Sequence, residues 1–429
     1  MLCVVLAGCG SGGGAEGPRP EPDSYLGLTT PTDGFQLRSI GVDLGPGEER
    51  EYCEIVQLPG TPADEYYVSS MEIANGKASH HLGLAIAYPG SQAARAVAAL
   101  GVGNRVQCPG PRLVFGEGIE VIATIQTPYG TTVLPPGVAR KHHGGELMVF
   151  DYHYANPGTE TLEARSAANF HLVEAATVQH LVQAFSLNNV TIDIPPGQTA
   201  SVSGECHFGT DMVVPAFTRH THHWGTEFSV WHSGGARDGE HIWTSMDWEH
   251  DTEFTFPEPA VVRAGEGFGY RCTYANDTSQ RLRFGTRVSD EMCMLYGPAW
   301  PVNSGDDLGE NYCNVTWVDG QGVGHPATEA GGTPKPSAEE AALCNSVAGG
   351  ALDACVSCIC NSCAVPALKC VTDPDCSPLL ACFFGCRDAA CIQGCQDLVR
   401  EHSAGAGPFM SSAECVRFGC PVCFGGTAQ

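Results

Sequence analysis

The stretch of sequence that decides the fold runs from Leu147 to Gly158 and reads LMVFDYHYANPG. Nine mainly apolar and aromatic residues are followed by Asn-Pro-Gly, which is typical of a strand that ends in a turn. Similar short segments of alternating polarity, separated by turn signals, extend from about residue 34 to residue 313. Helical periodicity is weak there, except in the Ala-rich segment 91–100. The pattern predicts an all-β region of two tandem antiparallel β-sandwiches.

The composition agrees with this fold class and excludes some functions. The chain has 429 residues, of which 16% are charged, and it contains 53 glycines and 29 prolines. Such a chain is long enough for two or three domains, and its glycines and prolines suit short strands joined by many turns. The formal net charge of −26 repels nucleic acid and anionic membrane surfaces alike.

Changes in composition along the chain predict five segments. They are a lipoprotein-type signal with a flexible tether at 1–33, a first sandwich at 34–185, a second sandwich at 186–319, a linker at 320–338 and a Cys-rich module at 339–429.

The beginning of the chain resembles a bacterial lipoprotein signal. A short apolar run, without a preceding Lys or Arg, ends in Leu-Ala-Gly-Cys, and the resemblance implies lipidation of Cys9. No later segment reaches the roughly 20 apolar residues of a membrane helix, so we expect membrane contact only through this anchor. Because free thiols are kept reduced in the cytosol, 22 cysteines favour an oxidising compartment, the periplasm or the cell surface.

Fourteen of the cysteines fall between Cys344 and Cys423. The spacings Cys382-x3-Cys386 and Cys391-x3-Cys395 place each pair on one helix face, which predicts two helices stapled together. The cluster of cysteines at 355, 358, 360 and 363 has a spacing that could also hold zinc or an iron–sulfur cluster. Seven disulfides are the favoured interpretation, in a helical module that protects the protein, anchors it or docks onto another surface component.

Four motifs bear on metal chemistry: His80-His81, His153, His220-Thr221-His222 and Met292. In a strand, residues two apart project from the same face, so His220 and His222 can share one metal ion. A thioether is a soft ligand that favours Cu(I), whereas three imidazoles serve both copper oxidation states. Adjacent histidines in a regular strand face opposite ways, so His80 and His81 need a bulge or a twist to converge.

These motifs, with His-Tyr at 153–154 and Glu-Met-Cys at 291–293, resemble the copper type II, ascorbate-dependent monooxygenases, the peptidylglycine α-hydroxylating and dopamine β-monooxygenase family. The resemblance covers about residues 35–315. It implies two jelly-roll sandwiches that hold two copper ions across a solvent-filled cleft. By motif, an electron-transfer copper falls to His80, His81 and His153, and an oxygen- and substrate-binding copper to His220, His222 and Met292. Ascorbate or a similar reductant would be the co-substrate.

The same resemblance implies a disulfide frame and a catalytic-site residue. Its disulfide pairs are Cys53–Cys108, Cys206–Cys313 and Cys272–Cys293; spacing alone leaves 15 possible connectivities among these six cysteines. Tyr296 is retained as the catalytic-site residue.

Departures from the family bear on the substrate. Thr218 stands where the peptide-amidating members have an arginine, and Arg219 is offset by one residue. Met294 replaces an asparagine and Asp151 a glutamine. With Trp224, these departures argue against peptide amidation and favour a less polar or aromatic substrate.

We therefore expect an exported copper monooxygenase that hydroxylates a C–H bond of a small organic substrate with O2 and a one-electron reductant. One alternative is a non-catalytic extracellular copper-binding protein that retains the sites, and another is an adhesion or interaction scaffold. The remaining histidines of the region are interpreted as structural or solvent-facing: His142, His143, His207, His223, His232, His241 and His250.

Overall fold

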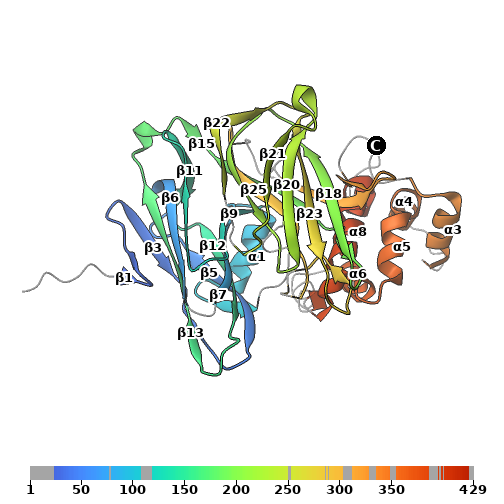
Figure 1. Ribbon diagram of the computed structural model, residues 1–429, viewed down its shortest axis with the longest axis horizontal. Coiled ribbons are helices and arrows are strands. Elements are labelled where there is room, and N and C mark those ends of the chain that lie inside the picture. The colour runs from blue at the N-terminus through green and yellow to red at the C-terminus, as the bar shows by residue number, and fades with distance from the viewer. Residues whose placement is uncertain are drawn as a thin grey trace, which may run out of the picture.

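Two β-sandwiches and a helical module follow one another along the chain (Figure 1). The computed structural model describes residues 24–76, 79–107, 118–249, 253–285, 287, 289–302, 312–327, 335–347, 354–385, 395, 398–399 and 401–424. The architecture is mostly β with a small disulfide-bonded helical part, which confirms the predicted fold class. Cys9 and the expected tether up to residue 23 lie outside the described residues.

The first sandwich consists of two sheets. One has the strand order β15-β11-β6-β14-β3, with β10 also paired to β6, and the other has the order β8-β5-β12-β7-β9. The strands of the first sheet are β3 (Gly34–Arg38), β6 (Glu65–Asn75), β10 (Tyr129–Val133), β11 (Val138–His143), β14 (Ser166–Leu172) and β15 (His180–Leu181). Those of the second are β5 (Glu49–Gln57), β7 (Ser79–Ala87), β8 (Arg105–Gln107), β9 (Ile119–Ile125) and β12 (Leu147–Ala155).

Strand β12 occupies the centre of its sheet, and both of its faces are covered. Phe150 and Tyr152 are fully buried in the core between the two sheets. Val149, on the opposite face, packs in a second cluster with Val97 of helix α1 (Gln92–Leu100). His153 has the same parity as Val149, so it projects from the face outside the sandwich core. Helix α1 forms in the Ala-rich segment, as predicted, and the Ser91 side chain accepts a hydrogen bond from the Ala94 N–H as its N-cap.

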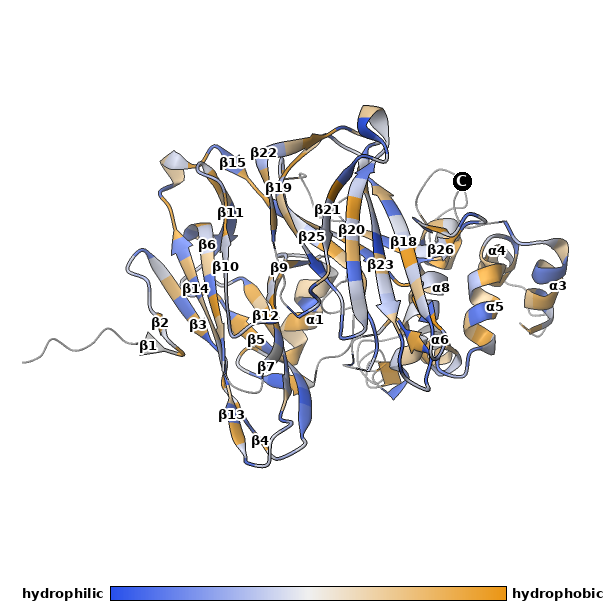
Figure 2. Cartoon of the chain, viewed as in Figure 1, coloured by the Kyte–Doolittle hydropathy of each residue, from blue (hydrophilic) through white to orange (hydrophobic). Residues whose placement is uncertain are grey.

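The second sandwich is formed by one ten-stranded sheet that folds over on itself. Its order is β21-β20-β23-β18-β27-β26-β16-β25-β19-β22. The ring of Phe268 on β23 lies 5.9 Å from those of Phe185 and Phe217, which come from the other half of the sheet. The strands are β16 (Gln183–Asn189), β18 (Thr199–His207), β19 (Met212–His220), β20 (Gly225–Ser233), β21 (His241–Ser245), β22 (Phe254–Val262), β23 (Gly267–Ala275), β25 (Met294–Ala299), β26 (Tyr312–Val318) and β27 (Val323–Pro326). Many strands of both sandwiches alternate between hydrophobic and hydrophilic residues (Figure 2), as the sequence pattern predicts.

The two sandwiches share a construction at the ends of equivalent strands. Asn156 follows β12, and its amide donates to the carbonyls of Leu44 and Gly45. Asn276 follows β23 and donates in the same way to the carbonyls of Ile194 and Pro195. Each asparagine satisfies backbone groups of a short ribbon at the edge of its sandwich: β4 (Val42–Leu44) with β13 (Leu162–Ala164), and β17 (Asp193–Ile194) with β24 (Leu282–Arg283).

A buried ion pair lies where the sandwiches meet. Glu120 of β9 and Arg140 of β11 pair with each other and are 1% and 6% exposed. The Glu120 carboxylate also accepts a hydrogen bond of 2.6 Å from the Ala184 N–H of the second sandwich. The hydroxyl oxygen of Tyr312, also from the second sandwich, accepts a hydrogen bond of 3.3 Å from the Val121 N–H.

Replacing Glu120 by leucine is expected to lower the free energy of unfolding by about 3–5 kcal/mol, because Arg140 would remain buried without its counter-charge. The double change Glu120→Leu/Arg140→Met removes both charges and should cost clearly less. Urea denaturation of the metal-free variants measures the difference. Equal losses in the single and double variants would contradict the ion-pair argument.

The C-terminal module is a cluster of short helices held by disulfides. They are α3 (Ala338–Val347), α4 (Ala354–Ser362), α5 (Ala364–Thr372), α6 (Cys376–Gly385) and α8 (Ala406–Gly419). The four cysteines of the 355–363 cluster bond to four different partners, which excludes the zinc and iron–sulfur interpretations. The described bridges of the module are Cys344–Cys360, Cys355–Cys423, Cys358–Cys420, Cys363–Cys415, Cys370–Cys376 and Cys382–Cys395.

The remaining cysteines of the module, Cys386 and Cys391, lie outside the described residues. Across the described part of the chain, no helix alone is long and apolar enough to span a membrane. Helices α4 and α5, bent by 96° at their junction, pass that test of length and composition only as a pair.

Candidate copper centre

The first two candidate ligands are cross-strand neighbours. His81 of β7 is paired directly with His153 of β12. Residues paired in this way project from the same face of a sheet. Their ring centroids lie 5.2 Å apart, with the planes at 86°. The sheet therefore brings two imidazoles together at one end of β12, on the face outside the core of the first sandwich.

A β-bulge lies at the third candidate ligand. The register along β7 and β12 pairs His81 with His153 but Ser79 with Tyr154, so His80 is an extra residue on its strand. A bulge re-aims the side chain of the extra residue, which is what two adjacent histidines need in order to converge on one ion. The backbone of His80 belongs to β7, whereas its side chain lies outside the described part of the structure.

Contacts at two of the histidines, His153 and His222, indicate which ring nitrogen would bind a metal. Nε2 of His153 lies 2.7 Å from the Glu49 carboxylate, an arrangement that suits metal binding through Nδ1. In His222 the order is reversed, since Nδ1 lies 2.9 Å from the Asp290 carbonyl oxygen, which suits metal binding through Nε2. Nδ1 of His153 and Nε2 of His222 are both buried. A carboxylate or carbonyl on the far nitrogen is the usual support of a metal-bound imidazole, so these residues fit a copper ion.

The second pair lies at the end of β19. His220 is the last residue of this strand and His222 follows two residues later, with ring centroids 5.2 Å apart. Their side chains are 5% and 1% exposed. The cross-strand partner of His220 is Met294 of β25, and the candidate thioether ligand Met292 lies two residues before it. Met292 is 5% exposed and belongs to the core of the second sandwich.

One carboxylate ties the Met292 loop to the histidine strand. Glu291 is fully buried and accepts hydrogen bonds from the backbone N–H groups of His222 at 2.9 Å, Trp224 at 2.8 Å and Met292 at 3.2 Å. Burial raises the pKa of this carboxyl to about 8, against the lowering effect of the three donors. Glu291 thus fixes the backbone of two candidate ligands of the same site.

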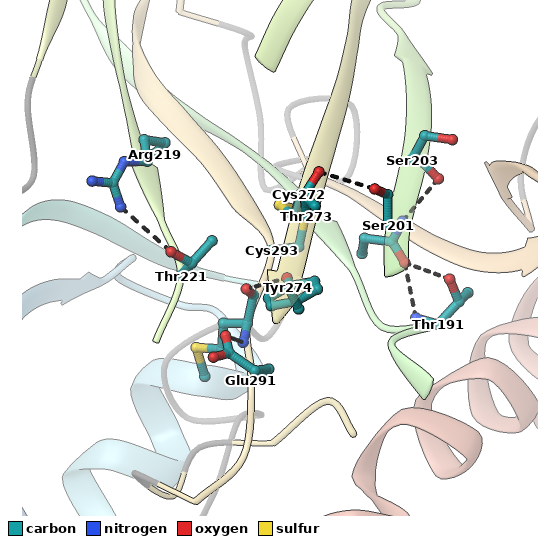
Figure 3. Close-up of a disulfide and its surroundings, with 12 residues drawn as sticks. Thr191, Ser201, Ser203, Arg219, Thr221, Cys272, Thr273, Tyr274, Glu291 and Cys293 are labelled. Atoms are coloured by element: carbon teal, nitrogen blue, oxygen red, sulfur yellow. Dashed lines mark hydrogen bonds between the residues drawn. A yellow bond between two sulfur atoms is a disulfide. The ribbon is translucent and has the colours of Figure 1, made fainter. Parts of the chain in front are cut away.

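A disulfide and a tyrosine hold the same loop from inside the sandwich (Figure 3). Cys293 is bonded to Cys272 of β23, and the Tyr274 hydroxyl donates to the Met292 carbonyl at 2.7 Å. Closing a loop of this length stabilises the protein by roughly 3 kcal/mol through chain entropy. The structure also contains Cys206–Cys313, so both pairs that the resemblance implies for the second sandwich are present. Cys53 is disulfide-bonded, while its expected partner Cys108 lies outside the described residues.

Successive side chains of β19 point alternately toward the candidate site and toward the body of the domain. Thr218 is paired with Tyr296 across the sheet and has the same parity as His220. Both Thr218 and Tyr296 line a cavity between the two sandwiches, together with Ala123, Arg140 and Glu253.

Arg219 has the opposite parity and is 1% exposed. Its guanidinium contacts the hydroxyl of Thr221 (Figure 3), the hydroxyl of Ser245 and the carbonyl of Trp248. It therefore faces away from the site, as the one-residue offset predicts, and supports the chain segment that follows β21.

The two histidine pairs meet across the domain interface. The ring centroids of His81 and His220 are 6.2 Å apart, at an interplanar angle of 77°. The described imidazoles consequently form a series, His153, His81, His220 and His222, with edge contacts between neighbours. This direct approach differs from the expected separation by a solvent-filled cleft. Within the described residues, no three His, Cys, Asp or Glu side chains converge as one metal site; each pair needs a further ligand, His80 or Met292.

Asp151 lies two residues before His153 on β12 and has the same parity. Burial raises the pKa of its carboxyl to about 7. It is paired with Cys53 and Gly83 in the neighbouring strands.

The spare histidines have structural or surface positions. His142 is buried beside Glu146 at 3.1 Å, His207 contacts Ser233, and His223 lies exposed between two tryptophan rings. His250 lies outside the described residues. The sequence analysis missed Glu49, Asp290 and Glu291 as supports of the candidate ligands. Only the position of Glu291 directly before Met292 offered a signal.

Comparisons with known proteins give one family match. No curated protein sequence matches the chain. Among solved structures, the STIV MCP is similar at 8% identity over 62% of this chain and 97% of its own, with a TM-score of 0.29. PNGF-II is similar at 10% identity over 58% of each chain, with a TM-score of 0.24. These scores are too low to support an argument. Residues 175–316 match the copper type II ascorbate-dependent monooxygenase family, C-terminal domain, which supports assignment of the second sandwich to this family.

Proposed function

We propose that the protein is an exported copper-dependent monooxygenase that hydroxylates a C–H bond of a small organic substrate. The observation that carries the proposal is the series of four imidazoles across the domain interface, with a bulge at His80 and a methionine loop at the other end. A purely structural scaffold would not need a methionine on the loop that Glu291 ties to the buried His222. The family match of the second sandwich supports the same chemistry.

Each residue has a defined task in this proposal. His80, His81 and His153 would hold an electron-transfer copper, and His220, His222 and Met292 would hold a second copper where oxygen and substrate react. Bound copper supplies the one-electron chemistry: O2, the substrate C–H bond, two electrons from ascorbate or a similar reductant and two protons give a hydroxylated product and water. Tyr296 and Thr218 would line the substrate position, since both lie on the cavity between the sandwiches.

Export agrees with the disulfides. Eight bridges are present among the described residues, and such a density persists only in an oxidising compartment. Anchoring through a lipid on Cys9 is part of the proposal, and mass spectrometry of the N-terminal peptide from membranes tests it.

Metal analysis and oxygen uptake test the enzyme. We expect about two copper ions per chain, and O2 consumption with ascorbate that rises when a suitable substrate is present. The panel should contrast phenethylamine-like amines with acyl-glycine-like carboxylates. Thr218 offers no cation for a carboxylate, and Arg140, which also lines the cavity, is paired with Glu120. Because Glu253 lines the same cavity, amines are expected to react faster.

Two outcomes would contradict the proposal. Two copper ions without substrate-dependent uptake across the whole panel would favour the alternative, a non-catalytic copper-binding protein. A single copper ion, or zinc alone, would contradict the two-site assignment itself.

A further inference from the structure

The Cys-rich module packs directly against the second sandwich. Helix α8 contacts β26, and its first residue, Ala406, belongs to the core of the sandwich. A Cβ atom on Gly407 would lie 2.5 Å from the Val190 carbonyl oxygen and 3.4 Å from the Phe284 Cβ. Only glycine therefore allows this approach. The module in Figure 1 lies on the far side of the second sandwich from the first sandwich.

Part of the contacted surface is the segment that leads to the candidate methionine ligand. This segment, residues 283–294, joins β24 to β25 and contains Asp290, Glu291 and Met292. At its start, Arg283 forms an ion pair of 2.7 Å with Asp373 of the module. Further along, the side chain of Ser403 lies beside the Asp290 carboxylate. Both Asp290 and Ser403 are buried, at 7% and 4% exposed.

The partners on the module are themselves held rigidly. Oδ1 of Asp373 accepts hydrogen bonds from the N–H groups of Asp375 and Cys376, while Oδ2 binds Arg283. The disulfide Cys370–Cys376 closes the short loop that carries Asp373. These bonds hold Asp373 in the orientation that binds Arg283, which lowers the conformational entropy lost in forming the ion pair.

A continuous path connects the module to the candidate copper site. Ser403 lies beside the side chain of Asp290, and the Asp290 carbonyl oxygen lies 2.9 Å from Nδ1 of His222. The next residue, Glu291, holds the backbone of His222 and Met292. Any displacement of Asp290 would therefore shift the support of two ligands of one site.

We propose that the Cys-rich module is a positioning clamp for the second copper site, in which Ser403 and Asp373 hold segment 283–294 in the geometry that His222 and Met292 require. This inference rests on the proposed function, because it assumes a copper ion at these residues. Ser403 and Asp373 are positioning residues and touch neither metal nor substrate.

The test uses the full-length protein with point variants. Ser403→Ala removes the hydroxyl that reaches Asp290. Its control is Ser412→Ala, since Ser412 is buried in α8 and its hydroxyl has no hydrogen-bond partner within the described residues. Arg283→Met removes the ion pair to the module. Its control is Arg281→Met, because Arg281 is bonded to Asp193 within the sandwich.

Two readouts separate this inference from the proposed function. Competition with a chromophoric Cu(I) chelator should show about tenfold weaker binding at the second site in Ser403→Ala and Arg283→Met, with unchanged binding at the first site and in both controls. X-ray absorption should show a reduced Cu–S contribution in the same two variants. In the metal-free protein, amide hydrogen exchange of residues 289–294 should become faster in these variants, while exchange in β7 stays constant.

Unchanged exchange and unchanged Cu(I) affinity in both variants would overturn the clamp. Faster exchange in a protein whose wild type binds no copper at His220 and His222 would overturn the proposed function but leave the mechanical coupling in place. If the control variants and the test variants had equal effects, the contact would contribute only to general stability, and the clamp would also be overturned.

Discussion

Replacing Met292 by isoleucine is expected to abolish hydroxylation, with a loss of at least about a thousandfold in kcat/KM. Isoleucine preserves the apolar volume in the core but offers no sulfur, so the second copper would lose its soft ligand. His222→Ala should have the same effect, because it removes an imidazole that the Asp290 carbonyl orients. In both variants copper content should fall from about two ions per chain to about one, measured by metal analysis together with substrate-dependent O2 uptake.

The matched control is Met246→Ile, in the same sandwich but 75% exposed. It should retain both copper ions and full turnover. Turnover retained in Met292→Ile would rule out the assignment of this thioether. Loss of both copper ions together would show that the sites do not bind metal independently.

Glu291→Ala should have the second largest effect, on stability and on copper binding alike. The change leaves the N–H groups of His222, Trp224 and Met292 without their acceptor in a buried place. At about 1–3 kcal/mol for each unsatisfied group, the free energy of unfolding should fall by roughly 5 kcal/mol. Urea denaturation measures the stability, and metal analysis of the folded fraction measures the second copper.

Two further variants sharpen this prediction. Glu291→Gln can keep the oxygen that accepts from His222 and Met292 and should lose clearly less stability. Glu258→Ala removes an exposed carboxylate of β22 in the same sandwich and should change little. A loss below about 1 kcal/mol in Glu291→Ala would mean that other groups or water satisfy the three donors.

The sequence predicted the sheets because burial in a sandwich leaves a local pattern. The alternation in residues 147–154 places Phe150 and Tyr152 in the core and His153 outside it, as the structure shows. The need for a bulge at His80 followed from the same parity, because neighbouring residues cannot share a face without one.

The supports of the candidate ligands could not be predicted in this way. Glu49 reaches His153 from 104 residues away, and the Asp290 carbonyl reaches His222 from 68 residues away. Carboxylates and backbone carbonyls are common, so nothing in the local sequence marks these particular ones. The direct approach of His81 to His220 depends on how two sandwiches pack, which no periodicity encodes.

The connection between the sandwiches limits how the protein can move. Strand β15 of the first sandwich ends at Leu181 and β16 of the second begins at Gln183, so a single residue separates them. A hinge this short, beside the buried contact from Glu120 to Ala184, gives the two halves little freedom to swing apart. In the proposed enzyme, small molecules would therefore reach the copper ions through side-chain movements between the two sandwiches, and turnover should depend on the width of the substrate more than on any opening of the halves.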